Sequence, residues 1–277
     1  MIEECFPLFI KIFVQLLIQQ LPILSMRLQN LVRIILICCL LANTISLIFI
    51  TEWAQNILRN WPQAIVLGII VFAFQSIILA GLVKPHFSEI SFRNLFDGKK
   101  LLIALIMGFV VWTFAQIWAH YVTGLPIDFP TSRRVKKYLF IFLLNSIPAA
   151  LIEEFIFRFL PVHYAEKKGI PRQQLIGLAI GVAIVFSLSH VSAYVFRDHT
   201  DFSALASPLI SAFFYGMAYF FVYVVTDNIY FTTLIHAFSN NQLYLVNSSY
   251  NDSFYFYTLI FVTLVWFMRK ETRRVRN

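Results

Sequence analysis

The sequence predicts an all-α fold, a polytopic membrane helical bundle of 8-9 transmembrane helices. Of its 277 residues, 59% are hydrophobic and only 13% are charged, whereas a soluble domain carries about 25% charged residues. The mean hydropathy is +0.74. Only 9 glycines and 10 prolines interrupt the apolar runs, which favours long helices. A membrane β-barrel would instead alternate polar and apolar residues in short strands with many turns.

Nine apolar runs approach the length of about 20 residues that a helix needs to cross a bilayer. The expected spans are 5–24, 34–50, 62–83, 101–122, 138–160, 174–193, 206–226, 230–247 and 254–268. The first run is the weakest, because Lys11 and three glutamines interrupt it. Its alternative is a position in the membrane interface, so the predicted count is eight or nine.

The distribution of polar residues divides the chain into three parts. Residues 1–130 are plain apolar helices, residues 131–250 carry the chemistry-bearing side chains, and residues 251–277 hold the last span and a basic tail. No repeat or separate soluble domain is visible. The start Met1-Ile2-Glu3-Glu4 lacks the basic region of a signal peptide, so no cleaved segment is expected.

The net charge of +8 indicates membrane orientation and not nucleic-acid binding, because the basic residues are scattered among short loops and the tail. In the nine-span arrangement, alternate loops and the tail on one side carry 14 Lys and Arg, and the other side carries 6. The richer side is cytoplasmic by the positive-inside rule. We therefore expect a multi-pass protein of the cell membrane with a cytoplasmic C-terminus.

Two adjacent carboxylates, Glu153 and Glu154, are the only ones of 14 acidic residues inside an apolar span. An ionised group at the centre of a membrane helix costs at least about 2.5–3.5 kcal/mol, so the pair calls for a role. Glu154 and Arg158 are four residues apart and are expected to form an ion pair. Glu153 is rotated from Glu154 by about 100° and faces elsewhere, where a carboxylate removed from water is a good general base. The alternative is that both acids only join helices through polar contacts.

Two histidines follow in later apolar segments. His190 closes the segment Phe186-Ser-Leu-Ser-His190, and His236 stands four residues before Asn240. Residues four apart project from one face of a helix. An imidazole and an amide on one face can donate hydrogen bonds to a developing oxyanion, and a second imidazole can share a water with the glutamate. The alternative is that each is a core histidine whose hydrogen bonds are satisfied.

Three motifs now stand in order, namely Glu153-Glu154-x-x-x-Arg158, Phe186-x-x-x-His190 and His236-x-x-x-Asn240. They resemble the motifs of the CPBP intramembrane proteases. That family groups type II CAAX prenyl endopeptidases with bacteriocin-processing and bacteriocin-immunity proteins (Abi). Gly216 and the turn Thr226-Asp227-Asn228 add to the resemblance, which covers residues 138–247. Phe159 departs from it, because many relatives have glycine there.

The resemblance implies an intramembrane endopeptidase that hydrolyses a peptide bond in a membrane-associated or peptide precursor substrate. Glu153 and His190 would activate the hydrolytic water, and His236 and Asn240 would stabilise the oxyanion. Glu154 and Arg158 would hold the site in shape. Within the same fold, the alternative is a non-proteolytic membrane scaffold or bacteriocin-immunity protein. A transporter is disfavoured, because neither inverted repeats nor broken helices are visible.

The sequence is compatible with a zinc-dependent mechanism and with a metal-free one. If a metal binds, its ligands would be Glu153, His190 and His236, a set typical of zinc hydrolases. We favour a metal-free glutamate–histidine mechanism, because Asn240 is a poor zinc ligand and fits an oxyanion site better. The peptide substrate lies at the bilayer, and its identity is beyond the sequence.

Glu153 and His190 can share one site only if they lie at similar depths in the membrane. If residues 161–173 form one simple turn, the two lie at depths that differ by about 10 Å at 1.5 Å per residue. We therefore expect Pro161 to end the glutamate helix early, with residues 162–171 along the interface, or the helices to tilt.

Overall fold

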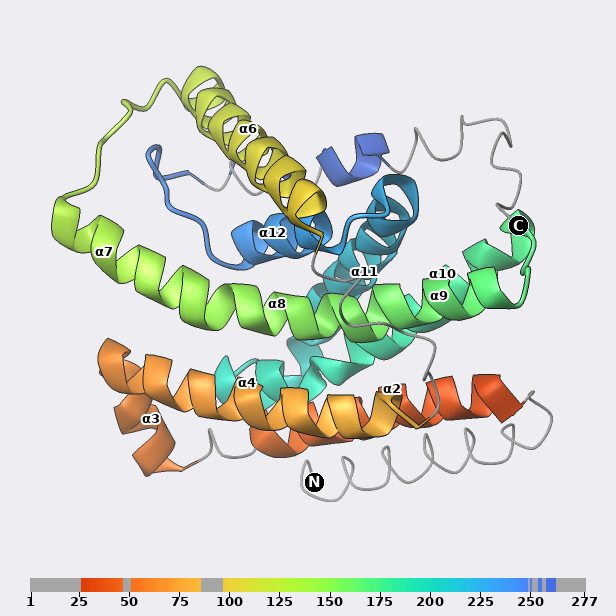
Figure 1. The fold of residues 1–277 in the computed structure, drawn as a ribbon. Coiled ribbons are helices and arrows are strands. Elements are labelled where there is room, and N and C mark those ends of the chain that lie inside the picture. Colours follow the sequence, from red (N-terminus) through yellow and green to blue (C-terminus); the bar gives the residue numbers. More distant parts are fainter. Residues whose placement is uncertain are drawn as a thin grey trace.

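The computed structural model describes residues 26–46, 51–85, 97–248, 250, 254–255 and 258–262. These residues form helices and turns without a β-strand, which confirms the predicted all-α class. The elements, in chain order (Figure 1), are α2 (Met26–Ser46), α3 (Glu52–Arg59), α4 (Trp61–Val83), α6 (Gly98–Thr123), α7 (Ser132–Ile141), η3 (Phe142–Ser146), α8 (Ile147–Glu154), η4 (Phe155–Phe159), α9 (Leu160–Lys167), α10 (Arg172–Ser189), η5 (Ala193–Arg197), η6 (Phe202–Ala204), α11 (Ala206–Thr226) and α12 (Ile229–Asn240).

Long apolar helices confirm a multi-pass membrane protein. Within the described residues, five are long and apolar enough to cross a bilayer: Trp61–Val83, Gly98–Thr123, Ser132–Lys167, Gln174–Phe196 and Ala206–Thr226. A shorter apolar helix covers Gln29–Ile45 and matches most of the predicted span 34–50. The predicted span 5–24 lies outside the described residues, and 254–268 is described only in part. The count of eight or nine is therefore not confirmed.

The predicted span 230–247 was wrong in length. Its helix, α12, has 12 residues and ends at Asn240, so it rises about 18 Å against a hydrocarbon core of about 30 Å. Residues 241–248 leave the helix. The side-chain oxygen of Gln116 on α6 accepts hydrogen bonds from the backbone N–H groups of Leu245 and Val246, at 2.8 and 3.3 Å. These bonds satisfy backbone groups that a longer helix would have paired internally.

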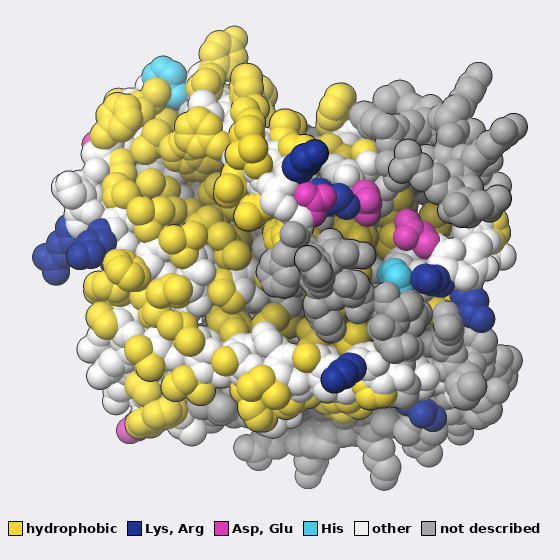
Figure 2. Space-filling model, in the orientation of Figure 1, with side chains coloured by type: hydrophobic (Ala, Val, Ile, Leu, Met, Phe, Trp, Pro, Cys, Tyr) yellow, Lys and Arg dark blue, Asp and Glu magenta, His cyan; other side chains and the backbone are white. Residues whose placement is uncertain are grey.

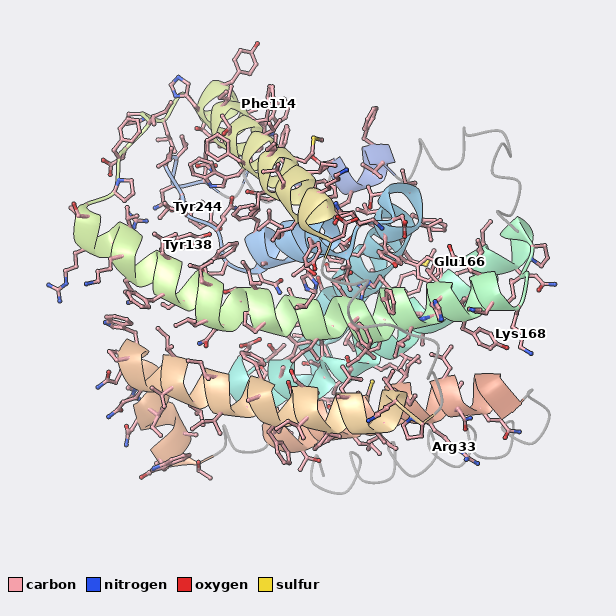
Figure 3. The ribbon with its side chains drawn as sticks, in the orientation of Figure 1. Arg33, Phe114, Tyr138, Glu166, Lys168 and Tyr244 are labelled. Atoms are coloured by element: carbon pink, nitrogen blue, oxygen red, sulfur yellow. The ribbon has the colours of Figure 1, made fainter. Side chains whose placement is uncertain are left out.

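One long curved helix, made of α7, η3, α8, η4 and α9, runs across the molecule (Figure 1). Helices α2 and α4 lie along one side of it, and α12 packs between α6 and α8 on the other. Figure 3 shows Tyr138 near one end of this long helix and Lys168 just beyond the other. We call these the Tyr138 end and the Lys168 end of the bundle.

Two π turns bracket the helix that carries Glu153 and Glu154. Each precedes a proline: η3 comes before Pro148, and η4 comes before Pro161. A proline ring clashes with the carbonyl four residues earlier in a regular α-helix, and in both cases that residue lies within the wider π turn. Pro161 therefore does not end the helix, which continues to Lys167, contrary to expectation.

Buried side chains are concentrated toward the Lys168 end. The largest apolar cluster joins the start of α2, the end of α4, α9 and the end of α11, with Leu31, Val83, Leu160 and Phe220 among its members. The outer faces carry exposed large hydrophobic residues such as Ile70, and Figure 2 shows wide hydrophobic areas on one face. Those faces suit contact with lipid.

Candidate active site

Glu154 contacts two partners from opposite sides. Its Oε2 lies 3.3 Å from Arg158 Nε, and both side chains are fully buried. Its Oε1 accepts a hydrogen bond of 2.7 Å from Nδ1 of His236. The predicted ion pair is present, and Glu154 also fixes the orientation of the imidazole on α12, which the sequence did not predict.

Glu153 faces away from Arg158, as its rotation on the helix predicted. Its Oε2 lies 3.6 Å from Nε2 of His236, and 32% of its side chain is exposed. His236 therefore lies between the two carboxylates. Because a carboxylate only accepts hydrogen bonds, Nδ1 of His236 carries the proton shared with Glu154, and Nε2 is the nitrogen that faces Glu153.

His190 caps the C-terminal end of α10. Its Nδ1 lies 2.8 Å from the carbonyl oxygen of Phe186, and a carbonyl only accepts. Nδ1 is therefore the protonated nitrogen in the neutral ring, which leaves the lone pair on Nε2. His190 lines the same cavity as Glu153, and within the described part of the chain no ion pair or hydrogen bond joins the two side chains.

The Arg158 guanidinium is surrounded by aromatic rings. It lies 4.3 Å from the ring centre of Phe186, 5.5 Å from Tyr219 and 5.8 Å from Phe157. None of its nitrogens has a hydrogen-bond partner among the described residues. Attraction to aromatic faces, worth about 2 kcal/mol or more when desolvated, thus adds to the pairing with Glu154.

Tyr219 on α11 supports His236 and was missed from the sequence. Its ring stacks on the imidazole, with centroids 4.6 Å apart and planes 19° apart. Its hydroxyl lies 2.5 Å from Oγ of Ser239, which in turn donates to the His236 carbonyl. No spacing signal in the sequence links this tyrosine to a histidine on another helix.

The turn before α12 sets the position of His236. Asp227 has a positive φ of 49°, and Asn228 caps the helix by accepting from the N–H groups of Tyr230 and Phe231. Lys100 of α6 donates to the backbone and the side chain of Asp227, and its own carbonyl accepts from Asn228. The predicted turn is thus bound to α6.

A cavity of about 980 Å³ joins the predicted residues. Glu153, His190, His236 and Asn240 all line it, and Asn240 is exposed at the end of α12. Glu154 and Arg158 lie behind them and are not part of the lining. Four of the six predicted side chains therefore face one space, and the other two support it.

The zinc ligand set fits this arrangement poorly. In the described residues, no three His, Cys, Asp or Glu side chains converge closely enough to hold a metal ion. Nε2 of His236 faces Glu153, but among the described residues His190 makes no ion pair or hydrogen bond with either of them. Glu153, His190 and His236 thus do not form a ready-made metal centre.

In a comparison with known protein families, residues 135–241 match the family model described as type II CAAX prenyl endopeptidase Rce1-like. No curated protein and no solved structure matched the chain. The matched segment contains all three motifs and the two helices that bring Glu154 to His236, and it lies within the range 138–247 expected from the motifs, apart from three residues at its start. This segment, which carries the site, is therefore similar to the type II CAAX prenyl endopeptidases of the Rce1-like family.

Proposed function

We propose that the protein is an intramembrane endopeptidase that hydrolyses a peptide bond with a water activated by Glu153. The observation that carries this proposal is the His236 imidazole, held by Glu154 through one nitrogen and facing Glu153 through the other. This group stands at the wall of a cavity formed by membrane helices. If Glu154 only stabilised the fold, there would be no need for Glu153 to face the same imidazole from the cavity side.

In the first step, Glu153 takes one proton from the water as the hydroxide oxygen attacks the substrate carbonyl carbon. Nε2 of His190, which has a lone pair when Nδ1 donates to Phe186, accepts the second hydrogen of that water and orients it. General-base catalysis of this kind contributes typically about 10²–10⁴ in rate.

The oxyanion that forms is stabilised by Asn240 and His236. Because Nδ1 of His236 donates to Glu154, Nε2 donates to an oxyanion only when the ring is protonated. With Glu153 protonated, the charges of Glu154, Arg158, an imidazolium and the oxyanion sum to zero, which suits a site shielded from water. In the last step, the proton held by Glu153 moves to the departing amine nitrogen as the C–N bond breaks.

We propose that the reaction runs without a metal. Asn240 is a poor zinc ligand, and among the described residues no three His, Cys, Asp or Glu side chains converge to hold a metal ion. The test is the rate of the purified enzyme after dialysis against EDTA and 1,10-phenanthroline. The rate is expected to stay within about twofold, and recovery of a lost rate by added Zn²⁺ alone would contradict the proposal.

The substrate is proposed to be a membrane-associated peptide or peptide precursor, as the family match suggests. The function is tested by substrate processing in cells that express Glu153→Ala or His190→Ala. Each is expected to lose at least about 10²-fold in processing, and Glu166→Ala, changed at the Lys168 end (Figure 3), serves as the control. Full processing by both site variants would refute the mechanism. A phenotype that survives Glu153→Gln would favour the non-proteolytic scaffold or immunity role.

A further inference from the structure

The catalytic cluster occupies only part of the cavity. Helices α8, α10 and α12 form the wall that carries Glu153, His190 and His236. The facing wall is formed by α2 and α4, which lie outside the family-matched segment 135–241. The site therefore has one wall that the family match covers and another that it does not.

The α2–α4 wall is mostly apolar, and Gln75 of α4 is its amide side chain. It presents Leu41 and Ile45 from α2 and Leu67, Val71 and Phe72 from α4. Binding pockets use such surfaces for apolar groups and a few polar groups to fix orientation. The side chains that this wall would contact in a substrate are therefore large and apolar.

Asn145 supplies a polar group at the junction of the two walls. Its Oδ1 is buried without a hydrogen-bond partner among the described residues and lies against Gly68, where any Cβ would collide with it. Its Nδ2 is not among the buried unpaired atoms, and Asn145 lines the cavity. Both Oδ1 and Nδ2 lie close to Gly68 of α4, so the Asn145 amide stands at the edge of the cavity, where its N–H₂ group can donate a hydrogen bond to a ligand.

The lining of the cavity extends to the Tyr138 end. Helices α10 and α12 reach it with their last residues, and α4 and α11 with their first turns, at Ala64 and Pro208. Trp61 at the start of α4 pairs with Phe140, which places that start at the Tyr138 end. The packed cluster described above closes the Lys168 end. A segment of chain would thus enter along one direction.

We propose that the α2–α4 half of the cavity is a substrate subsite for an extended peptide segment with large apolar side chains, anchored by a hydrogen bond from the Asn145 amide to a substrate backbone carbonyl. This inference rests on the proposed function, since the subsite places the scissile bond against Glu153. It assigns side-chain selectivity to residues outside the matched segment.

Substrate selectivity tests the subsite. A mixed peptide library is cleaved by the purified full-length protein, and the residues around each cut are identified. Val71→Phe is expected to shift the preferred residue at one position from Leu or Phe to Ala, by at least about tenfold in relative kcat/KM. Val66→Phe is the matched control, because Val66 is 57% exposed and does not line the cavity. Equal profiles for the two variants would overturn the proposal.

The proposed hydrogen bond from Asn145 to the substrate is tested separately, by steady-state kinetics. Asn145→Ala is expected to raise KM by about tenfold, because a hydrogen bond to substrate is lost, while kcat stays within about threefold. A loss confined to kcat would overturn the assignment of Asn145 as a positioning residue.

A binding experiment separates failure of the subsite from failure of the proposed function. In the Glu153→Gln protein, p-benzoylphenylalanine is placed at position 71 or 66, and a biotinylated nine-residue peptide with Leu at every second position is the probe. Cross-linking is expected at 71 and not at 66, and a peptide with Ser in place of Leu should not cross-link. Equal labelling at both positions, or by both peptides, would overturn the subsite whether or not the protein is a protease.

Discussion

At the scale of single residues, Glu154 links the stability of the bundle to the geometry of the site. One of its oxygens neutralises Arg158, and the other holds His236. Removing one partner of a buried ion pair costs about 3–5 kcal/mol, because the other charge stays buried, whereas replacing both by apolar residues is often neutral. The same substitutions should therefore affect stability and activity differently.

We expect Glu154→Ala to lower the free energy of unfolding by about 3–5 kcal/mol, because it leaves Arg158 unpaired. The double variant Glu154→Leu, Arg158→Met should recover most of that stability and remain inactive, because His236 loses its partner. Unfolding in mixed detergent measures the first effect, and peptide hydrolysis the second. An active double variant would contradict the role of Glu154.

The exposed pair Lys100–Asp227 is the control for that measurement. Its side chains are 40% and 58% exposed, so the pairing of their charges is worth at most about 1 kcal/mol.

The sequence predicted contacts within one helix better than contacts between helices. The spacing of Glu154 and Arg158 predicted their pairing, and the rotation of Glu153 predicted that it faces elsewhere. The bond from His236 to Glu154 joins residues 82 positions apart, and no pattern in a single sequence encodes that distance. The stacking of Tyr219 on His236 was missed for the same reason.

At the scale of elements, α10 and α11 meet at Gly216. A Cβ there would lie 3.0 Å from Phe186 and 3.4 Å from the backbone of Ala183. Phe186 is the ring that faces Arg158 and contacts His190, with ring centroids 4.6 Å apart. The packing of these two helices is thus connected directly to the site.

Gly216→Ala is expected to cost about 1–3 kcal/mol through overpacking and to lower hydrolysis by displacing Phe186. Gly181→Ala, on the neighbouring helix, is the matched control, because nothing lies within 4 Å of its Cβ. That control should be neutral or slightly stabilising, since alanine favours the helix. Thermal unfolding of the two purified variants makes the comparison, and equal midpoints would contradict the close packing at Gly216.

Local backbone geometry is where the prediction of elements failed. The sequence predicts that Pro161 ends the glutamate helix, but the π turn before this proline lets the helix continue. Phe159, the departure from the family pattern, lies within that π turn and packs against Phe155 and Tyr223. It is not among the cavity-lining residues, so the departure leaves the reacting groups in place.

At the scale of the whole molecule, the described lining of the cavity extends to the Tyr138 end of the bundle. Lys84 follows the end of α4, and Lys167 and Lys168 end α9, so the Lys168 end carries a group of cations. We propose that the Lys168 end and the C-terminus are cytoplasmic by the positive-inside rule. The Tyr138 end, and the cavity lining that extends to it, would then face outward. Hydropathy alone predicted the membrane class, but not that α12 is too short to span.

Thiol labelling in intact cells tests that orientation. In a protein with Cys5, Cys38 and Cys39 replaced by Ser, Ser211→Cys lies in the cavity lining near the start of α11. A membrane-impermeant maleimide should label it from outside, whereas Lys168→Cys should react only after the cells are permeabilised. The reverse pattern would contradict the proposed orientation.

The central claim is that Glu153 activates a water that cuts a peptide bond. It is tested most directly by incubating the purified protein with a peptide library in H₂¹⁸O and analysing the new C-termini by mass spectrometry. The account predicts ¹⁸O in the carboxyl group of each product from the wild-type protein, and at least about 10²-fold less product from Glu153→Gln. Equal amounts of labelled product from the two proteins would contradict it.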